Sequence, residues 1–330
     1  MHPLTRFFNY LKRKDFSMAL AREHIGARDL TEWYPDWMYE LMETDEVRNQ
    51  PYQDAIQEAV SGKVVLELGT GRRALWAVRC ARAGAKRVYA IEANERAYQS
   101  SLRVLKSEGI ENVQLICGFS DKVDLPERCD VLVHDLVGDI GSSEGMIPFI
   151  DDARQRLLKS DATHIPRQCT TYAVLAEDPK LSAAEWIFSY GLRGLQRFDA
   201  VPFVRFFGFP QAAALSEPQV FEDIAFPQTP VLETNTRVVV EIKRDGELRG
   251  VLLFIRLHFG GTRVVNTWTS QTSWATPYVR FKQATPVRKG DLVEMSIQSD
   301  LSGDPSYFLR LARIVNGSAS EIGQYAWSGD

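Results

Sequence analysis

The sequence predicts a two-part fold, in which an α/β domain with a doubly wound parallel sheet is followed by an antiparallel β domain, either a barrel or a sandwich. Between residues 63 and about 166, short apolar strands alternate with amphipathic helices, which is the pattern of a parallel sheet. Beyond Pro166, strands follow one another through turn sequences. The chain has 330 residues, of which 45 % are hydrophobic, so it can form more than one core.

The chain divides into three regions. Residues 1–60 are expected to be helical, because aromatic residues and leucines recur there and β-branched runs are absent. Residues 61–166 are the α/β domain, and residues 167–330 are the β domain. Within the β domain, residues from about 183 to 215 are rich in aromatics and are expected to form a protruding arm. Because such an exposed apolar surface needs a partner, the arm predicts a dimer.

Four strands and three helices are expected in the α/β domain. The strands are KVVLELG (63–69), RVYAIEA (87–93), VQLICG (113–118) and CDVLVHDL (129–136). The helices are RRALWAVRCARAGA (72–85), NERAYQSSLRVLKSEGI (94–110) and GMIPFIDDARQRLLKS (145–160).

Three stretches predict strands in the β domain. Residues 236–259 contain two strands joined by a turn at Asp245 and Gly246. Residues 278–299 repeat this arrangement around a turn at 289–291, and residues 306–315 form a further strand.

Composition excludes several classes of protein. The net charge of −4 gives no general electrostatic reason to bind nucleic acid or an anionic membrane, and the arginines and lysines between residues 72 and 87 fit a solvated helix face. The apolar runs are too short to span a bilayer, and residues 1–16 lack the features of a signal peptide. The four cysteines form no CxxC pair and the five histidines lie far apart. We therefore expect a cytoplasmic protein with reduced thiols and no metal site.

The first strand and the turn after it favour a nucleoside site. Gly69 and Gly71 allow a tight turn and a close ligand approach, and Glu92 ends the next strand, where a carboxylate can accept hydrogen bonds from both ribose hydroxyls. Alanine at position 74 breaks the GxGxxG pattern that cradles a pyrophosphate, which favours an adenosyl group over a dinucleotide. Asp121, after the third strand, is a candidate for the adenine amino group. The alternative is an ordinary turn with a surface glutamate.

An acidic loop follows the fourth strand. Asp135 comes directly after the strand, at the sheet edge where ligands bind in open α/β folds, and Glu144 lies nine residues later. Glycines at 138, 141 and 145 allow the loop to fold back and bring the two carboxylates together. A planar guanidinium is the natural guest between two carboxylates, because it binds them bidentately. The alternative is that both are solvated loop charges.

Five motifs in the correct order make the chain resemble the protein arginine methyltransferase family over roughly residues 30–315. YELMETDEVRNQPY (39–52) resembles the family's N-terminal segment, and VVLELGTG (64–71) and AGAKRVYAIEAN (83–94) resemble its first two S-adenosylmethionine motifs. DLVGDIGSSEGM (135–146) resembles its double-glutamate loop, and TSQTSW (269–274) its Thr-His-Trp loop. The resemblance implies a Rossmann-like methyltransferase sheet followed by a β-barrel with a dimerisation arm, and N-terminal helices that cover the cofactor site.

The resemblance also implies two sets of site residues. The cofactor-binding set for S-adenosyl-L-methionine, whose product is S-adenosyl-L-homocysteine, is Arg48, Glu67, Gly69, Gly71, Glu92 and Asp121. The catalytic carboxylates are Asp135 and Glu144, and the substrate pocket contains Met42, Met146 and Trp274. In this scheme Arg48 pairs with the methionyl carboxylate, Glu92 holds the ribose and the two loop carboxylates grip the guanidinium.

Three positions depart from the family pattern. Asp135 stands in place of a glutamate and is one methylene shorter, Ser273 stands in place of the histidine, and the turn GTGRRA (69–74) lacks its third glycine and looks one residue longer. These departures favour an unusual substrate, or else a non-catalytic homologue that acts as a binding or scaffold protein. Such a homologue would not bind S-adenosylmethionine or S-adenosylhomocysteine.

The implied substrate is arginine. The resemblance leaves open whether it is free L-arginine of a specialised-metabolite pathway, as in some bacterial members, or arginine in a peptide or protein. RNQPY (48–52) resembles the branches that add a single methyl group, which points to a monomethylated product. In the family the arm docks on a second subunit, which implies a homodimer.

Overall fold

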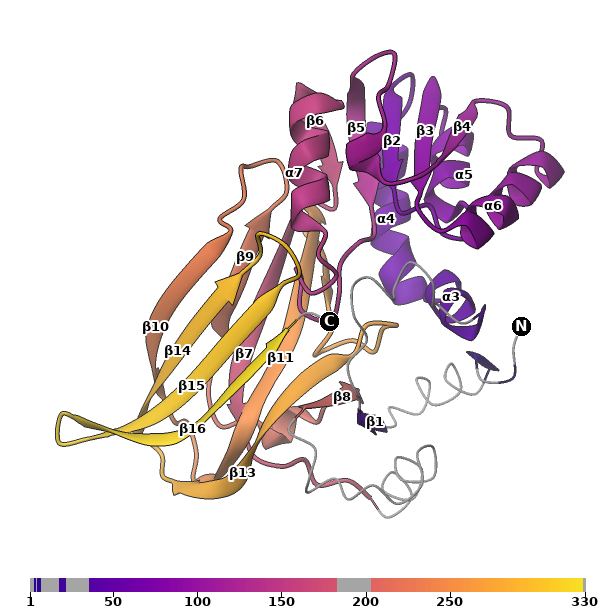
Figure 1. Cartoon of the computed structure of the whole chain (residues 1–330). Helices are drawn as coiled ribbons and strands as arrows, with labels where there is room; N and C mark the ends of the chain where they lie inside the picture. Colours follow the sequence, from indigo (N-terminus) through magenta and orange to yellow (C-terminus); the bar gives the residue numbers. More distant parts are fainter. Residues whose placement is uncertain (1–2, 4, 7–17, 22–35, 183–202, 329–330) are drawn as a thin grey trace.

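The computed structural model describes residues 3, 5, 6, 18–21, 36–182 and 203–328. An α/β unit with a parallel sheet lies beside a larger unit of long antiparallel strands (Figure 1). Both parts of the predicted fold class are therefore confirmed. Of the N-terminal region, which was expected to be helical, residues Asp36–Glu43 form helix α3 and residues Glu46–Ala59 form α4. The expectation was wrong for Met18–Ala21, which form strand β1 because they pair with strand β8 (Phe203–Phe207) of the antiparallel unit. Residues 22–35 and 183–202, which include the first part of the expected arm, lie outside the described residues.

The parallel sheet has five strands in the order β4-β3-β2-β5-β6. Their bounds are β2 (Val64–Leu68), β3 (Arg87–Glu92), β4 (Val113–Cys117), β5 (Cys129–His134) and β6 (Leu158–Ile165). Every residue of the central strand β2 is buried, because helices cover the sheet and apolar side chains pack on both of its faces. The parallel arrangement brings the carboxyl ends of β2, β3 and β5 to one edge.

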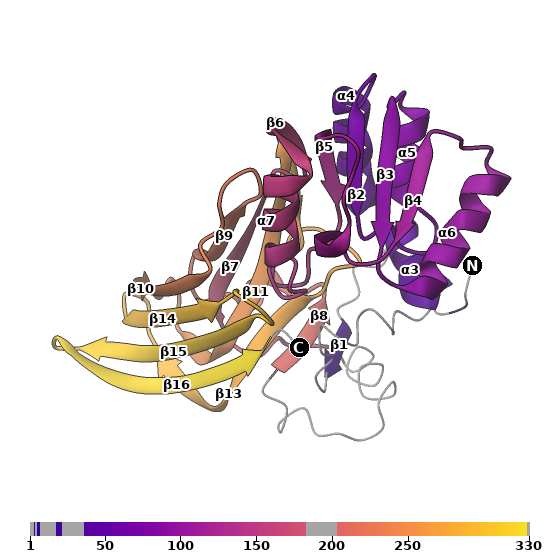
Figure 2. The same ribbon diagram turned by 45° about the horizontal axis from the view of Figure 1, so that its top comes forward.

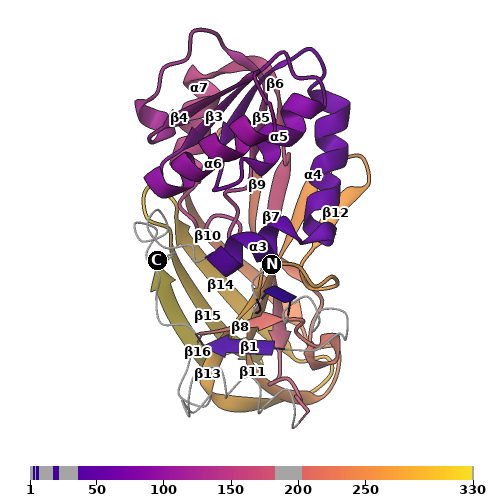
Figure 3. The same ribbon diagram turned by 90° about the vertical axis from the view of Figure 1, so that its right-hand side faces the viewer.

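Three helices and a short 3-10 turn belong to this sheet. They are α5 (Leu75–Arg82), α6 (Glu95–Ser107), α7 (Ile147–Arg156) and η1 (Ser120–Lys122). Figure 3 shows α5 and α6 lying across one face of the sheet, whereas Figures 1 and 2 show α7 next to the β unit. Asn94 caps α6, because its side chain accepts a hydrogen bond from the amide of Ala97 at 3.0 Å.

The helix that we expected at residues 145–160 ends at Arg156, and its last part belongs to β6. β6 pairs with β5 at the sheet edge, and Lys159, Ser160 and Asp161 are exposed. An edge strand with polar exposed residues lacks a continuous apolar run, so the pattern of apolar residues did not predict a strand here. The fifth strand was therefore found only in the structure.

The β unit consists of two antiparallel sheets. The first has the order β1-β8-β13-β11-β7-β9, with β12 paired to β11, and the second has the order β10-β14-β15-β16. The first-sheet strands are β1 (Met18–Ala21), β7 (Gln168–Ala176), β8 (Phe203–Phe207), β9 (Gln219–Ala225), β11 (Gly246–Gly260), β12 (Arg263–Asn266) and β13 (Thr276–Val287). The second-sheet strands are β10 (Glu233–Glu241), β14 (Leu292–Asp300), β15 (Ser306–Val315) and β16 (Ser318–Ser328). The short helix η3 (Gln211–Ala213) precedes β9.

The two expected turns join strands of different sheets. β10 and β11 follow each other across residues 242–245, and β13 and β14 follow each other across 288–291, yet neither pair is hydrogen-bonded as a hairpin. The two corners bind each other instead, because the carboxylate of Asp245 accepts a hydrogen bond from the amide of Lys289 at 2.9 Å. Turn residues specify that the chain reverses, but packing of the two sheets decides which strands pair.

The described part of the expected arm, residues 203–215, packs into the β unit. β8 lies between β1 and β13 in the first sheet. Phe206 and Phe209 are buried against Tyr278. No helix within the described ranges is long and apolar enough to cross a membrane.

Candidate active site

The turn after β2 is shaped by its glycines. Gly69 and Gly71 have φ angles of +73° and +66°, a region that L side chains rarely adopt. A Cβ atom on Gly69 would lie 2.5 Å from the side chain of Leu136, so a larger residue does not fit there. The turn brings its backbone to the carboxyl edge of the sheet, which is where open α/β folds bind ligands.

Glu92 ends β3 and lies beside this turn. Its carboxylate accepts hydrogen bonds from the amide of Gly71 at 2.6 Å and from the amide of Asn94 at 2.7 Å. Burial raises the pKa of Glu92, while the two amides oppose that rise. The sequence placed Glu92 at this edge, and the structure brings it into direct contact with the glycine turn.

Glu67 has a different position from Glu92. Its side chain is fully buried within β2 and accepts a hydrogen bond from the hydroxyl of Thr70 at 3.1 Å. Burial raises the pKa of Glu67 to about 8, so its carboxyl group is largely protonated at pH 7. Glu67 thus supports the turn from inside the sheet.

The protonation of Glu67 leads to a pH prediction. The folded-state pKa of about 8 lies above the usual value of 4.5, so the stability that protonated Glu67 contributes is complete below pH 4.5 and is lost as the pH rises to 8. Glu67→Gln removes this dependence. Urea unfolding at pH 5, 6.5 and 8 should show the variant gaining stability over the wild type by up to ~1.4 kcal/mol per pH unit. Parallel pH profiles for the two proteins would contradict the assignment.

The GTGRRA turn contacts helix α3 through its arginines. The guanidinium of Arg72 lies 2.7 Å from the carboxylate of Asp36 and 3.7 Å from the carboxylates of Glu40 and Glu43. Arg73 lies 3.4 Å from Glu43. In the sequence, these arginines belong to a turn that departs from the family pattern. In the structure, their ion pairs connect α3 to the turn.

Helix α3 also packs directly on the turn. A Cβ atom on Gly71 would lie 3.4 Å from Cε1 of Tyr39, and Cζ of Arg72 is 5.5 Å from the centre of the Tyr39 ring. Ala74, at the position of the missing third glycine, has a left-handed backbone with φ +47° and is fully buried. The turn therefore keeps a glycine-like conformation at an alanine.

Arg48 projects from α4 into the space between the two units and is only 4 % exposed. It forms an ion pair with the carboxylate of Asp135 and donates a hydrogen bond to the carbonyl of Met42 at 3.0 Å. Its guanidinium carbon is 5.1 Å from the ring centre of Trp274 and 6.0 Å from that of Trp76. One arginine thus joins α4, the end of β5 and the loop before β13.

Asp135 is held from two sides. In addition to the ion pair with Arg48, its Oδ1 accepts a hydrogen bond from the hydroxyl of Tyr52 at 3.0 Å. Tyr52 is fully buried and stacks on Trp76 with ring centres 4.3 Å apart. The carboxylate of Asp135 is therefore fixed close to the end of β5, as its short side chain requires.

The acidic loop folds back on itself. The amide of Ser143 donates to the carbonyl of Ile140 at 2.9 Å, and the amide of Gly145 donates to the carbonyl of Ser142 at 3.0 Å. A Cβ atom on Gly138 would lie 2.1 Å from Oγ of Ser143 and 3.2 Å from Cγ of Glu144, so glycine is needed where the two arms meet.

Glu144 lies within electrostatic reach of the Asp135 environment. Burial is the main cause that raises the pKa of Tyr52, and the charge of Glu144 raises that pKa further. The same two causes act on the pKa of Tyr39, together with the charge of Glu92. The charges of Glu92 and Glu144 thus both act on Tyr39, and that of Glu144 also acts on Tyr52.

The β unit fixes the loop at several points. The indole of Trp274 donates to the carbonyl of Val137 at 2.7 Å, and the amide of Ala275 donates to the carboxylate of Asp139 at 2.8 Å. Asp139 also pairs with Arg205 at 2.7 Å. The sequence analysis gave no role to Asp139, because nothing in the sequence shows that the β unit lies against this loop.

The loop that resembles Thr-His-Trp meets the start of α4. The backbone amide of Ser273 donates to the carboxylate of Asp45, whose other oxygen accepts from the amide of Arg48 at 3.4 Å. Asp45 therefore caps α4 and links it to the β unit with a backbone group of Ser273. Trp274 is 9 % exposed, so it is packed between the two units.

The two methionines of the expected pocket differ in burial. Met146 precedes α7 and is 1 % exposed within the main core, while Met42, in α3, is partly exposed and accepts hydrogen bonds from Arg48 and Asn49 through its carbonyl. Asp121, in η1, pairs with the neighbouring Lys122 at 2.8 Å and retains about a third of its exposure, 34 %. These residues lie around the carboxyl edge, and their individual roles remain predictions.

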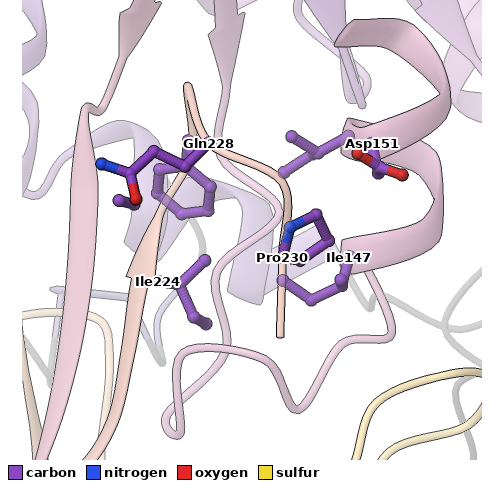
Figure 4. A pocket seen from close by; sticks show the side chains of 8 residues that line it. Ile147, Asp151, Ile224, Gln228 and Pro230 are labelled. Carbon is purple, nitrogen blue, oxygen red and sulfur yellow. The ribbon is translucent and has the colours of Figure 1, made fainter. Parts of the chain in front are cut away.

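Two other features adjoin the ends of the acidic loop. A small, mostly apolar pocket lies between α7 and the segment after β9, lined by Ile147, Asp151, Ile224 and Pro230 (Figure 4). His134 is fully buried, and burial lowers its pKa to about 3, so it is neutral at pH 7. Across the described residues, no three histidine, cysteine, aspartate or glutamate side chains group as metal ligands.

The parallel sheet, its glycine turn and the glutamate at the end of β3 define an α/β protein of the nucleoside-binding class. Comparison with known proteins shows which proteins the chain resembles. A family model described as "PRMT5 arginine-N-methyltransferase" matches residues 29–165. A probable protein arginine N-methyltransferase 6.2 of Oryza sativa subsp. indica is 33 % identical over 163 residues, which are 48 % of this chain and 38 % of the relative. The chain thus spans less than two fifths of the length of this plant relative.

A second relative is matched over most of its length. The arginine N(omega)-methyltransferase of Streptomyces achromogenes subsp. streptozoticus is 27 % identical over 281 residues, covering 80 % of this chain and 76 % of the relative. In sequence the chain is therefore similar to protein arginine methyltransferases, as its five motifs predicted.

Two solved structures share the fold. The Trypanosoma brucei PRMT1 enzyme-prozyme heterotetrameric complex with AdoHcy has a TM-score of 0.72 at 17 % identity and covers 91 % of this chain and 99 % of its own. Arabidopsis thaliana protein arginine methyltransferase 10, in an open conformation, has a TM-score of 0.72 at 16 % identity and covers 88 % and 97 %. These matches extend the similarity of fold from the parallel sheet to the β unit.

Proposed function

We propose that the protein is an S-adenosylmethionine-dependent N-methyltransferase that acts on the guanidino group of arginine. One observation carries the proposal: the acidic loop is fixed at the carboxyl edge of the sheet by Asp135, which pairs with Arg48 and accepts from Tyr52, and by the indole of Trp274, which donates to Val137. Carboxylates next to a nucleoside-type turn suit a cationic substrate and an adenosyl cofactor.

The residues at the edge fit the cofactor. Each oxygen of Glu92 accepts one amide hydrogen bond and keeps a second lone pair, so the carboxylate can also accept from two ribose hydroxyls. Arg48 offers a buried cation for the methionyl carboxylate. When bound, S-adenosylmethionine supplies a methyl group on a sulfonium centre.

The loop carboxylates act on the substrate. A guanidinium is a poor nucleophile because its charge is delocalised and its pKa exceeds ~12. Asp135 and Glu144 would draw that charge towards the nitrogens they bind and orient the remaining nitrogen for attack. Positioning of this kind can lower a barrier by roughly 7–11 kcal/mol in favourable cases. We assign Glu144 as the carboxylate closer to the reacting nitrogen.

The substrate test compares two guanidino compounds. The full chain is incubated with labelled S-adenosylmethionine and either free L-arginine or an arginine-rich peptide, and products are measured by mass spectrometry. The length over which the chain matches the Streptomyces arginine N(omega)-methyltransferase favours transfer to free arginine. The segment RNQPY (48–52) points to a single methyl group. Transfer only to the peptide would make the protein a protein-modifying enzyme, and transfer to neither would reject the proposed substrate.

A second function is favoured by the state of Asp135. Its carboxylate is already bound by Arg48 and Tyr52, which suits a homologue that no longer binds a guanidinium. Such a protein would act through its surface as a binding partner. Calorimetric titration with S-adenosylhomocysteine separates the two readings, because the enzyme is expected to bind it and the binding protein is not.

The contact between Arg72 and α3 predicts salt-dependent cofactor exchange. Arg72→Gln removes three carboxylate contacts, and a surface ion-pair network of this size contributes ~1 kcal/mol. S-adenosylhomocysteine should therefore dissociate about fivefold faster from the variant than from the wild type, and salt should accelerate only the wild type. Stopped-flow displacement measures both rates. Arg73→Gln, which loses a single contact, is the control, and equal rates in all three proteins would refute the role of Arg72.

We also propose a homodimer. The aromatic residues of the expected arm that precede residue 203 motivate it, because residues 203–215 pack within the β unit, and the solved Trypanosoma brucei structure of this fold is named as a heterotetrameric assembly. Light scattering of the full chain should give a mass near twice 37.4 kDa. A mass of one chain at micromolar concentration would reject the dimer.

A further inference from the structure

A buried carboxylate of the β unit binds the crest of the acidic loop, which we define as Gly141 and Ser142. Glu222 lies in β9 and is 6 % exposed. One of its oxygens accepts from the amide of Ser142 at 3.0 Å and from the hydroxyl of Thr171 at 2.7 Å, and the other accepts from the hydroxyl of Ser142 at 2.6 Å. Ser142 is the second residue before Glu144.

The hydrogen bonds around Glu222 run in one direction. The amide of Gly141 donates to the hydroxyl of Thr171 at 2.9 Å, and Thr171 donates to Glu222. The hydroxyl of Tyr307 lies 2.6 Å from that of Ser142, and because the Ser142 proton points to Glu222, the Tyr307 hydroxyl is the donor. The amides of Ser142 and Gly141 thus both lead to Glu222, the first directly and the second through the hydroxyl of Thr171.

The loop is shaped to meet this carboxylate. A Cβ atom on Gly141 would lie 2.9 Å from Oε1 of Glu222 and 2.8 Å from Sγ of Cys169, so only glycine lets the crest approach so closely. Hydrogen bonds from Ser142, Thr171 and Gly141, and no cation among the described residues, oppose the rise in the pKa of Glu222 that burial causes. A buried carboxylate held only by hydrogen bonds is costly to stability, which suggests a function for it.

We propose that Glu222 is a positioning residue that sets the place of Glu144 for the guanidino substrate. Two contacts connect Glu222 to Glu144. Glu222 fixes the amide and hydroxyl of Ser142. The carbonyl of Ser142 in turn accepts from the amide of Gly145 at 3.0 Å and so closes the turn that contains Glu144. Glu222 makes no contact with the glycine turn or with Glu92. This inference rests on the proposed methyltransferase function.

The matched control is the neighbouring residue Asp223. It lies on the same strand and accepts from the hydroxyl of Thr170 at 2.7 Å and from Gln168 at 2.7 Å, without contacting the acidic loop. Glu222 and Asp223 thus bind adjacent β7 threonines through similar hydrogen bonds. Any effect of losing a carboxylate from β9 in general should appear in Asp223→Asn as well as in Glu222→Ala.

The kinetic test uses the full chain, S-adenosylmethionine and free L-arginine or the arginine-rich peptide. Glu222→Ala is expected to lower kcat about 100-fold, because a displacement of about 1 Å can have that effect, while its affinity for S-adenosylhomocysteine stays as in the wild type. Asp223→Asn should keep the wild-type kcat. The double variant Glu222→Gln/Tyr307→Phe should have a higher kcat than the single variant Glu222→Gln. Glutamine leaves the Tyr307 hydroxyl without an acceptor, and phenylalanine removes that hydroxyl.

Failure of the proposed function and failure of this inference give different results. A wild type that neither binds S-adenosylhomocysteine nor transfers a methyl group rejects the function. An active wild type with unchanged kcat in Glu222→Ala rejects the inference. Hydrogen exchange at the amide of Ser142 decides the matter without turnover: exchange should accelerate in Glu222→Ala and not in Asp223→Asn, and equal rates in both variants overturn the positioning role.

Discussion

Glu144→Gln is expected to lower methyl transfer about 100- to 1000-fold, while binding of S-adenosylhomocysteine persists. Glutamine keeps the shape of the side chain and one acceptor oxygen, but it removes the negative charge that polarises the guanidinium. Glu144 is a partly exposed loop residue, so the substitution leaves no buried charge behind. A loss of turnover therefore reports on chemistry rather than on folding.

The measurement combines initial rates with thermal unfolding. Glu217→Gln, at the surface just before β9, is a control for loss of one carboxylate away from the site. The assignment predicts normal unfolding and normal cofactor binding for both variants, with the rate lowered only in Glu144→Gln. Full activity of Glu144→Gln would remove Glu144 from the mechanism. Loss of cofactor binding would show that Glu144 binds the cofactor rather than the guanidino substrate.

Arg48→Met should have the second large effect, and it should act on stability and cofactor binding together. Arg48 and Asp135 form a buried ion pair, with side-chain exposures of 4 % and 10 %. Removing one partner leaves the Asp135 carboxylate without its cation, which is expected to lower the free energy of unfolding by about 3–5 kcal/mol. The same change removes the cation that we assign to the methionyl carboxylate.

A double variant separates the two effects. Arg48→Met/Asp135→Asn removes both charges, so much of the lost stability should return, because no buried ion is left unpaired. Binding of S-adenosylhomocysteine should not return. Urea unfolding and calorimetric titration of the two single variants and the double variant provide the cycle. Wild-type cofactor affinity in Arg48→Met would contradict the role of Arg48.

Local sequence signals located the edge of the sheet where the site lies. Glu92 and Asp135 each come at the end of an apolar strand, and parallel strands place their carboxyl ends together, so the order of the motifs was enough to bring them to one edge. Gly69 and Gly71 were recognised because a tight turn between strand and helix requires their positive φ angles.

Signals that depend on long-range packing were missed. β6 has polar exposed residues because it lies at the sheet edge. The members of each consecutive pair, β10 with β11 and β13 with β14, belong to different sheets because the two sheets pack face to face. Asp139 and Glu222 were not assigned for the same reason. Their partners, Arg205 and Ser142, are 66 and 80 residues away in the chain, and no local period relates such positions.

The sequence by itself determined the fold class, the resemblance to protein arginine methyltransferases and the chemical types of the candidate site residues, because strand period, turn glycines and motif order are local properties of the chain. Only the tertiary structure decided how these residues are used. It paired Asp135 with Arg48 and Tyr52, bound Arg72 to α3, and placed the crest of the acidic loop on Glu222. These contacts form where the β unit packs against the parallel sheet, and burial at that junction sets the strength of each charge interaction.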